Sequence, residues 1–229
     1  MHKRENVSMS VIRRLPRYYR FLHHLKVTGV TRISSTELSK KLGLTASQIR
    51  QDLNCFGGFG QQGYGYMVGQ LCDEICKILG LASGYKTILL GAGNLGRAIA
   101  NHMSFQAEGF QLIGVFDNSP DKIGTTIGGL TVSDVSGLED FCKEQSPVMA
   151  VLCVSRSAAE QLAKILYDLG IRNFWNFSHY DIYLKYPDTT VENVHLNDSL
   201  MTLCYRISNN SMSAKSAKKE EKPEQQVSD

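Results

Sequence analysis

The 229-residue sequence has no long hydrophobic run, since no stretch approaches the ~18 consecutive apolar residues of a membrane-spanning helix. An apolar signal segment behind the N-terminus is also lacking. The six cysteines have neither C-x-x-C spacing nor nearby histidines, which speaks against a zinc site and against a disulfide framework. We therefore expect a cytoplasmic protein with no membrane segment, no metal and mostly buried, reduced thiols.

Acidic residues are scarce in the first part of the chain. Residues 1–60 hold 3 of them against 11 lysines and arginines, whereas residues 61–200 hold 15 against 9. This uneven charge indicates that the basic N-terminal segment binds a polyanion and that the acidic segment after it does not. The length allows two modest domains.

A glycine-rich turn between a predicted strand (residues 87–90) and a predicted helix has the pattern G-x-G-x-x-G at Gly91, Gly93 and Gly96. The first glycine permits a tight turn, the second lets the backbone approach a pyrophosphate, and the third lets the helix pack closely on the strand. The free N–H groups of the helix would point at that phosphate. A second predicted strand ends in Asp117, where a carboxylate binds the ribose of NAD(H) and repels the 2′-phosphate of NADP(H). The pattern predicts an NAD(H) site; a glycine-rich turn without a ligand is the alternative.

Strand and helix patterns alternate from residue 84 to residue 194. Further strands are expected near residues 130–132, 148–154 and 174–177, and helices near residues 138–143 and 158–169. This alternation favours a Rossmann-like, doubly wound parallel sheet.

The N-terminal part carries clear helix signals. Residues 1–10 show none and are expected to form a mobile arm. Pro16 fits the first turn of a helix that Gly29 ends. Ser34 and Glu37 have the spacing of a capping box, which predicts the start of a second helix.

A third helix follows the second after only two residues. Gly43 ends the second helix, and Thr45 and Gln48 have the spacing of another capping box. Two capped helices joined by a glycine turn are typical of a helix-turn-helix. The outward face of the third helix is polar and carries Ser47, Gln48, Gln51 and Asn54, with Arg50 on its flank. Such side chains read base edges and phosphates, so the face predicts DNA binding; a merely solvated face is the alternative.

Glycines alternate with aromatic residues over residues 56–66. This alternation favours a short β-hairpin, the wing of a winged helix, over a plain linker. A connecting helix near residues 73–79 and a hinge at residues 80–84 would follow. The predicted fold is therefore α/β, with a winged-helix DNA-binding domain at residues 1–83 and a Rossmann NAD(H)-binding domain at residues 84–194.

Residues 195–208 predict an amphipathic helix. Its apolar positions recur at i, i+4, i+7 and i+11, at Leu196, Leu200, Leu203 and Ile207. With no sheet left to cover, the helix either packs on its own chain or crosses to a partner. We favour a swapped helix in a homodimer, because two-fold dimers read palindromic DNA sites. Polar residues dominate residues 209–229, where a disordered tail is expected.

Together these motifs resemble the Rex family of NADH-responsive, redox-sensing transcriptional repressors. The matching segments are residues 14–20, 34–38, 48–53, the glycine wing, 91–96, 116–117, 122–124, 170–171 and 176–177. The resemblance implies a homodimer with an N-terminal winged helix, a Rossmann domain and a C-terminal domain-swapped helix. It also implies that the protein binds operator DNA when NADH is scarce and releases it as the NADH/NAD ratio rises.

The resemblance also assigns roles to individual positions. The pyrophosphate would lie against Gly91, Gly93, Asn94, Leu95 and Gly96, and the adenosine end near Asp117, Lys122 and Ile123. Operator DNA would meet the recognition helix at Ser47, Gln48, Arg50 and Gln51, and the wing tip at Gly60, Gln61, Gln62 and Gly63. Arg14 and Arg17 would approach phosphates.

Several positions depart from the family pattern. Relatives usually carry basic residues where Gln51, Gln61 and Gln62 stand and an aromatic residue at Cys55, so we expect weaker DNA binding or a shifted operator. The proline that usually follows the fourth strand is replaced by residues 154–155, which bears on the nicotinamide end.

The predicted redox switch departs as well. His102 and His195 stand where many members have a tyrosine and an aspartate, while the partner arginine remains as Arg20. Two histidines and an arginine cannot form the same acid–base pairing. A paralogue with a weakened or lost NADH response is therefore an open alternative.

A third hypothesis is that the protein is an NAD-dependent oxidoreductase. It would need a general acid or base beside the nicotinamide and room for a substrate domain. Ser155, Asn176 and His179 lie near predicted strand ends, but the basic N-terminal segment and the terminal helix occupy the remaining length. We therefore expect that the protein is not an enzyme.

Overall fold

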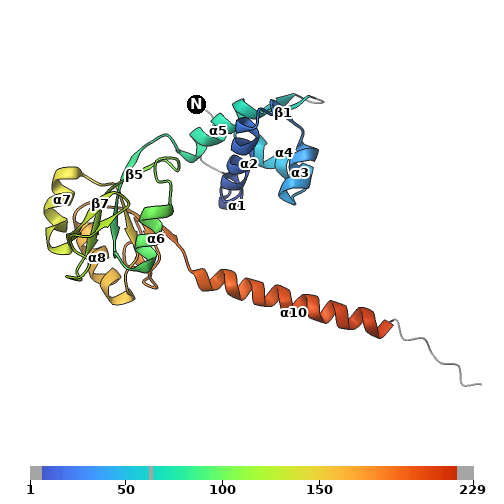
Figure 1. Cartoon of the computed structure of the whole chain (residues 1–229). Helices are drawn as coiled ribbons and strands as arrows, with labels where there is room; N and C mark the ends of the chain where they lie inside the picture. Colours follow the sequence, from blue (N-terminus) through green and yellow to red (C-terminus); the bar gives the residue numbers. More distant parts are fainter. Residues whose placement is uncertain (1–6, 62–63, 221–229) are drawn as a thin grey trace, which may run out of the picture. The chain divides into compact units, whose positions relative to one another are not determined.

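A computed structural model describes residues 7–61 and 64–220 and divides the chain into two compact units (Figure 1). Of the described residues, one unit comprises those up to Gly84 together with Ser104–Phe110, and the other comprises Tyr85–Met103 and those from Gln111 to Glu220. Within the described part of the chain, no helix is long and apolar enough to cross a bilayer.

The described part of the first unit contains five helices and a small sheet. The helices are α1 (Met9–Ile12), α2 (Leu15–Val27), α3 (Ser35–Leu42), α4 (Ala46–Asn54) and α5 (Val68–Leu79). The strands are β1 (Arg32–Ile33), β2 (Gly60–Gln61) and β3 (Gly65–Met67), in the order β1-β3-β2. The expected mobile arm is wrong at its end, because the Ser8 hydroxyl accepts from the Ser10 N–H and caps α1.

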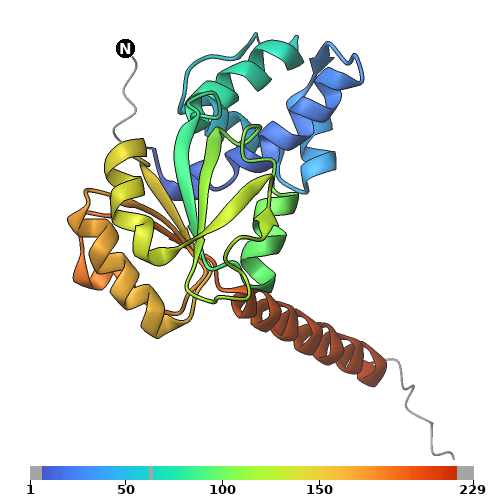
Figure 2. The same ribbon diagram turned by 60° about the vertical axis from the view of Figure 1, so that its left-hand side comes forward.

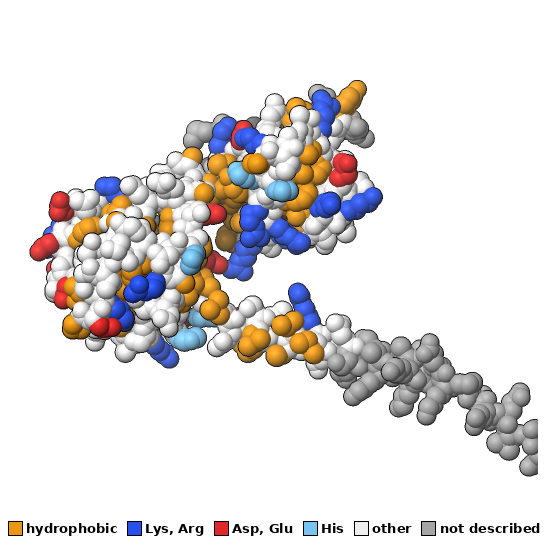
Figure 3. All heavy atoms as spheres, in the orientation of Figure 1, with side chains coloured by type: hydrophobic (Ala, Val, Ile, Leu, Met, Phe, Trp, Pro, Cys, Tyr) orange, Lys and Arg blue, Asp and Glu red, His pale blue; other side chains and the backbone are white. Residues whose placement is uncertain are grey.

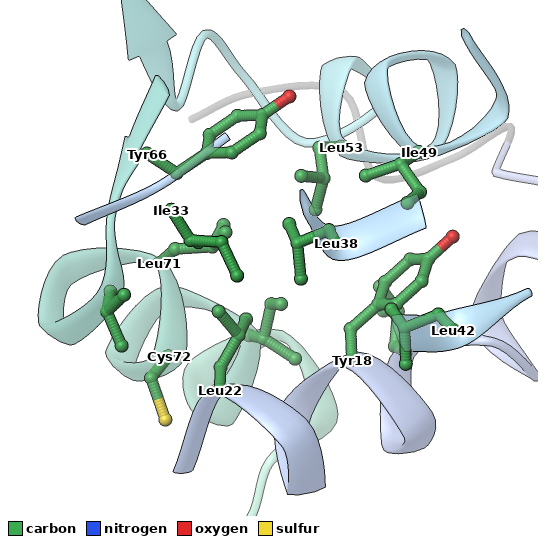
Figure 4. Packing of buried hydrophobic residues seen from close by; sticks show 13 residues of the cluster. Tyr18, Leu22, Ile33, Leu38, Leu42, Ile49, Leu53, Tyr66, Leu71 and Cys72 are labelled. Atoms are coloured by element: carbon green, nitrogen blue, oxygen red, sulfur yellow. The ribbon is translucent and has the colours of Figure 1, made fainter. Parts of the chain in front are cut away.

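The core of this unit joins all of its longer helices to the sheet. Figure 4 shows Tyr18 and Leu22 of α2 facing Leu38 and Leu42 of α3, Ile49 and Leu53 of α4, and Leu71 and Cys72 of α5. Helix α5 packs along α2 and begins earlier than the expected connecting helix. The recognition helix α4 is therefore held from behind by apolar contacts, which leave its polar face free to meet a ligand.

The two predicted capping boxes have different outcomes. At α3 the box is complete, because the Ser34 hydroxyl accepts from the Glu37 N–H and the Glu37 carboxylate accepts from the Ser34 N–H. At α4 the Thr45 hydroxyl accepts from the Gln48 N–H, but the Gln48 side chain donates instead to Asp52. The second box is therefore only half formed.

The predicted wing is confirmed as a hairpin. β2 pairs antiparallel with β3, with Gly60 opposite Tyr66 and Gln61 opposite Gly65. β3 also pairs with β1, which ties the hairpin to the residues just before α3. Gln62 and Gly63, expected at the wing tip, lie outside the described residues.

The described part of the second unit contains a seven-stranded sheet in the order β10-β9-β8-β4-β5-β7-β6. Figure 2 shows this sheet with helices packed against it. Its strands are β4 (Tyr85–Leu90), β5 (Phe110–Asp117), β6 (Thr126–Ile127), β7 (Leu130–Asp134), β8 (Met149–Leu152), β9 (Asn173–Asn176) and β10 (Thr190–Asn193). Pairs β4–β8, β8–β9, β9–β10 and β5–β7 run parallel, and β6 pairs antiparallel with β7. Leaving out the edge strand β6, this is the doubly wound Rossmann order, which confirms the predicted fold class.

Helices cover both faces of this sheet. They are α6 (Asn94–His102), α7 (Leu138–Gln145) after a 3-10 turn (Val135–Gly137), α8 (Arg156–Asp168) and α9 (Ile182–Lys185). Ile88 and Leu90 of β4 lie in one apolar cluster with α7 and α8, while Leu89 contacts α6 at Gly96. The chain reverses its winding direction between β4 and β8, and such a switch point is where doubly wound sheets bind ligands.

The terminal helix α10 (Leu196–Glu220) is longer than predicted. The expected disorder from residue 209 is wrong as far as Glu220, because the segment contains alanine and lysine, which favour helix, and its first proline is Pro223. Leu196, Leu200 and Leu203 are 64%, 59% and 51% exposed. Figure 3 shows apolar side chains along the described part of this helix.

Candidate functional site

The glycine loop lies at the carboxyl end of β4 and leads directly into α6. Gly91 has φ +99°, and a Cβ there would collide with the Cys153 carbonyl oxygen behind it. A Cβ at Gly96 would collide with the Gly91 carbonyl oxygen. Gly93 differs from both, because a Cβ there would meet no atom within 4 Å. Gly91 and Gly96 therefore shape the loop, whereas Gly93 leaves open space in front of it.

The N-terminus of α6 faces this open space without a side-chain cap. Gly93 is the N-cap residue and accepts from the Arg97 N–H, and no side chain of the described residues caps the helix. Asn94 and Leu95, the first residues of the helix, are exposed. N–H groups in a first helical turn have no partner within the helix and attract anions. The loop therefore fits a pyrophosphate.

Asp117 ends β5 beside the loop and is only 8% exposed. Its Oδ2 accepts from the Ala92 N–H at 2.6 Å, and its Oδ1 accepts from the Ser119 N–H at 2.9 Å. Lys122 Nζ lies 3.7 Å from Oδ2. Since each carboxylate oxygen can accept two hydrogen bonds, Asp117 fixes the glycine loop and keeps acceptor capacity for a ribose hydroxyl.

A cavity of about 360 Å³ opens at this end of the sheet. Gly91 and Asp117 lie on its wall, and most of the remaining lining is apolar, with Val135, Leu138, Val154, Leu162 and Ile165. Ligand pockets usually start at about this size and combine an apolar wall with a few polar groups. The cavity fits an adenosine.

Two other residues near the loop have defined places. Ile123 is half-buried in the turn after Asp117 and is not among the residues that line the cavity. Burial raises the pKa of the Cys153 thiol, behind Gly91, to about 12. A thiol with such a pKa is protonated at neutral pH and does not act as a nucleophile.

The recognition helix α4 presents the predicted polar face. Ser47, Gln51 and Asn54 are exposed, and no hydrogen bond from their side chains occurs among the described residues. Arg50 is also exposed, and its Nη1 donates to the Ser35 hydroxyl at 2.9 Å. The exposed face therefore offers hydroxyl and amide groups to a groove, with a cation beside them.

Arg14 and Gln48, both predicted to contact DNA, have hydrogen-bond partners within the protein. Arg14 donates from Nε and Nη2 to the two oxygens of Asp52, at 2.6 and 2.7 Å. Tyr18 and Gln48 donate to the same carboxylate. Arg17, by contrast, is exposed on α2. The structure thus gives Arg14 and Gln48 partners within the protein and leaves Arg17 available.

The candidate switch residues are divided between the two units. Arg20 is exposed on α2, and His102 is exposed in the last turn of α6. His195, just before α10, stacks on His179 with ring centroids 5.4 Å apart and planes 6° apart. His195 Nδ1 is buried and has no hydrogen-bond partner among the described residues.

Asp52 is a buried residue that the sequence analysis missed, and it accepts hydrogen bonds from two predicted DNA-contacting residues, Arg14 and Gln48. Its position was detectable, because Ile49, Asp52 and Leu53 have the i, i+3, i+4 spacing of an inward helix face. A carboxylate at an inward position in a basic segment calls for a buried cationic partner. That partner, Arg14, lies 38 positions earlier, so the sequence alone could not identify it.

Comparisons with known proteins agree with both candidate sites, the DNA-binding face and the dinucleotide loop. Residues 6–54 match the family model described as "Putative DNA-binding protein N-terminus", and residues 83–180 match the model described as "CoA binding domain". A redox-sensing transcriptional repressor Rex from Clostridium perfringens is 50% identical over 210 residues, which cover 92% of this chain and 99% of the relative. The chain belongs to the Rex family. A Rex from Thermoanaerobacter pseudethanolicus is 53% identical over 208 residues, covering 90% and 92% of the two chains.

Solved structures of RSP, a Rex-family repressor, are similar to this chain in sequence and in fold. The crystal structure of RSP in complex with β-NAD⁺ and operator DNA is 49% identical, with a TM-score of 0.83, and covers 96% of this chain and 100% of that chain. The crystal structure of RSP in complex with β-NADH is 48% identical, with a TM-score of 0.82, and covers 91% and 98%. The predicted family and fold are therefore confirmed, and the Rex relatives are repressors rather than enzymes.

Proposed function

We propose that this chain is an NADH-responsive transcriptional repressor that binds double-stranded operator DNA and releases it as the NADH/NAD ratio rises. One observation carries the proposal: a chain of the Rex family combines an exposed amide and hydroxyl face on α4 with an open glycine loop next to Asp117. The first feature suits base edges and the second suits a dinucleotide. Because operator DNA is its partner, we place the protein in the cytoplasm.

The dinucleotide site uses the loop, the helix and the carboxylate together. Gly93 and the first N–H groups of α6, from Asn94 and Leu95, would hold the pyrophosphate. Asp117 would bind a ribose hydroxyl and select NAD(H) over NADP(H). The adenine would enter the apolar cavity, with Lys122 and Ile123 near the adenosine end.

The DNA site uses one winged-helix unit from each of two protomers. Ser47 and Gln51 of α4 would face base edges, Arg50 and Arg17 would approach phosphates, and the wing from Gly60 to Gly63 would reach the minor groove. The homodimer would form through the apolar positions of α10. Two protomers related by a two-fold axis would then read a palindromic site.

A second candidate is a Rex paralogue with a weakened NADH response. The observation that favours it is the His195 ring, whose buried Nδ1 has no partner among the described residues and which stacks on His179. The two candidates differ only in whether nucleotide binding changes DNA affinity.

One experiment separates the candidates and the enzyme alternative. A preferred duplex is selected from a randomised DNA library with the full-length chain, and its binding is measured by gel shift without nucleotide, with NAD⁺ and with NADH. The repressor predicts loss of the complex with NADH and its retention with NAD⁺. An NADH-insensitive complex would favour the paralogue, and failure to select any site would reject both. NADH consumption in the same samples would instead indicate an oxidoreductase.

A further inference from the structure

The carboxylate of Asp52 accepts four hydrogen bonds, and three of them join α4 to α2 and its N-cap residue Arg14. Oδ1 accepts from Arg14 Nη2 at 2.7 Å and from Gln48 Nε2 at 2.9 Å. Oδ2 accepts from Arg14 Nε at 2.6 Å and from the Tyr18 hydroxyl at 2.5 Å. A carboxylate has about four lone-pair sites, so these donors saturate it. The four side chains are called the Asp52 clamp below.

The Asp52 clamp is buried at its centre and spans one turn of each helix. Asp52 is 1% exposed and Tyr18 is 2% exposed. Gln48 and Asp52 are four residues apart on α4, and Arg14 lies four residues before Tyr18 at the start of α2. Arg14 and Tyr18, at two levels of α2, hold the carboxylate of α4, and Gln48 orients that carboxylate from the preceding turn of α4. Directional bonds of this kind resist rotation of α4 about its own axis, which apolar packing alone allows more easily.

The clamp also removes Gln48 from the residues suited to reading bases. A glutamine reads adenine with its amide N–H₂ and its carbonyl oxygen at the same time. In this structure the Gln48 N–H₂ donates to Asp52, and the residue is half-buried. The side chains of Ser47, Gln51 and Asn54 are exposed on the same helix without such a bond among the described residues.

Arg14 is likewise bound by the clamp. Two of its three guanidinium nitrogens donate to Asp52, and its charge is matched by that carboxylate. A matched arginine releases few counterions when DNA binds, whereas an exposed arginine such as Arg17 releases about one. The two arginines therefore differ in what they contribute to the salt dependence of binding.

We propose that Asp52 is a positioning residue which, with Arg14 and Tyr18, fixes the rotation of α4, and that Gln48 belongs to this clamp rather than to the residues that read bases. Base discrimination then comes from Ser47, Gln51 and Asn54. This inference rests on the proposed DNA-binding function.

The first test compares two glutamines on the same helix. A preferred duplex is selected from a randomised DNA library with the full-length wild-type chain, and affinities are measured for that duplex and for each single base-pair variant. Gln51→Met is expected to lose about tenfold or more of the discrimination at one base pair per half-site. Gln48→Met is expected to change all affinities by the same factor and to leave the order of preference intact.

The second test compares two arginines by the salt dependence of affinity for the selected duplex. Arg17→Gln is expected to reduce the slope of log affinity against log salt by about 0.9 for each phosphate that the side chain no longer neutralises. Arg14→Gln is expected to lower the affinity but leave the slope unchanged. The slope does not depend on the fraction of folded protein, so the comparison holds even where Arg14→Gln destabilises the unit.

The outcomes distinguish the inference from the function on which it rests. If the wild-type chain selects no duplex, the proposed function fails. If it selects one and Gln48→Met changes the preferred base at a position, Gln48 reads DNA and the inference is overturned. A reduced slope for Arg14→Gln would overturn the role assigned to Arg14. Uniform loss for Gln48→Met with an unchanged slope for Arg14→Gln supports the clamp.

Discussion

At the scale of single residues, the same amino acid has different roles within one motif. Gly91 needs its positive φ and leaves no room for a Cβ, whereas Gly93 has an ordinary φ of −68° and open space around it. Gly91 is therefore required by the fold, and Gly93 is required only by a ligand that approaches the backbone. The sequence pattern alone treats the two glycines alike.

This difference predicts that two matched substitutions affect different properties, stability for one and NADH binding for the other. Gly91→Ala should lower the melting temperature, because the methyl group collides with the Cys153 carbonyl and the backbone conformation disfavours alanine. Gly93→Ala should leave the melting temperature unchanged and weaken NADH binding. Thermal melts and calorimetric NADH titrations on both variants test this. A normal NADH affinity for Gly93→Ala would argue against a pyrophosphate at this loop.

The charge state of Asp52 gives a pH-dependent prediction. Burial disfavours its ionised form, but hydrogen bonds from Arg14, Tyr18 and Gln48 outweigh burial and lower the pKa of the carboxyl group. A carboxylate with a lowered folded-state pKa stabilises the protein above its unfolded pKa of about 3.9, and this contribution is lost as the pH falls through the folded value. The contribution is therefore complete at neutral pH.

The matching experiment uses Asp52→Asn, which keeps the shape of the side chain. At pH 7 the substitution should cost about 3 kcal/mol or more in the free energy of unfolding of the first unit, because it leaves the Arg14 charge without its partner. The difference from the wild-type chain should shrink as the pH falls below about 4. Denaturant unfolding at several pH values measures it, and a difference independent of pH would contradict the ionised clamp.

At the scale of secondary structure elements, local signals predicted the structure where the interacting residues are neighbours in sequence. The Ser34 capping box and the glycine that ends α3 are confirmed, because each depends on residues within one turn. The second box is only half formed because the Gln48 side chain donates to Asp52, four residues further along the same helix. Arg14 and Tyr18, which are distant in sequence, hold that carboxylate. Strand β10 and helix α9 were missed, since β10 is recognisable only through its pairing with β9.

Helix α10 carries the prediction of a dimer at this scale. Its leucines are more than half exposed, and a chain that exposes such a stripe normally covers it with a partner. Leu203→Glu should shift the protein from dimer to monomer and reduce operator affinity by at least about tenfold, because only paired half-sites bind tightly. The control is Thr202→Glu, which adds the same charge away from the stripe.

Analytical ultracentrifugation and gel shifts on the same samples measure both effects. NADH binding should be unchanged in either variant, because the glycine loop and Asp117 lie in the sheet domain rather than on α10. A Leu203→Glu protein that remains dimeric would contradict the role assigned to this helix.

At the scale of the whole molecule, the chain crosses between the two units three times. The chain passes from the first unit to the second after Gly84, returns after Met103 and passes again after Phe110. The segment Ser104–Phe110 therefore belongs to the DNA-binding unit, although it directly follows α6 of the dinucleotide loop. No local pattern in the sequence predicts this assignment, because the contacts of Gly109 with Gly80 and Leu81 join residues that are distant in the chain.

Because of this connectivity, the helix at the proposed nucleotide site leads directly along the chain into the DNA-binding unit. Helix α6 begins at the proposed phosphate site and ends at His102, next to the second crossing. If NADH and operator DNA favour different arrangements, each must weaken the binding of the other by the same factor. Coupling of this kind usually amounts to about 5- to 150-fold.

The most direct measurement is therefore the affinity of the full-length chain for NADH, determined with and without a saturating amount of the selected duplex. The account predicts that DNA weakens NADH binding at least about fivefold, by the same factor with which NADH weakens DNA binding. An affinity for NADH that is identical in the free and the DNA-bound protein would contradict it.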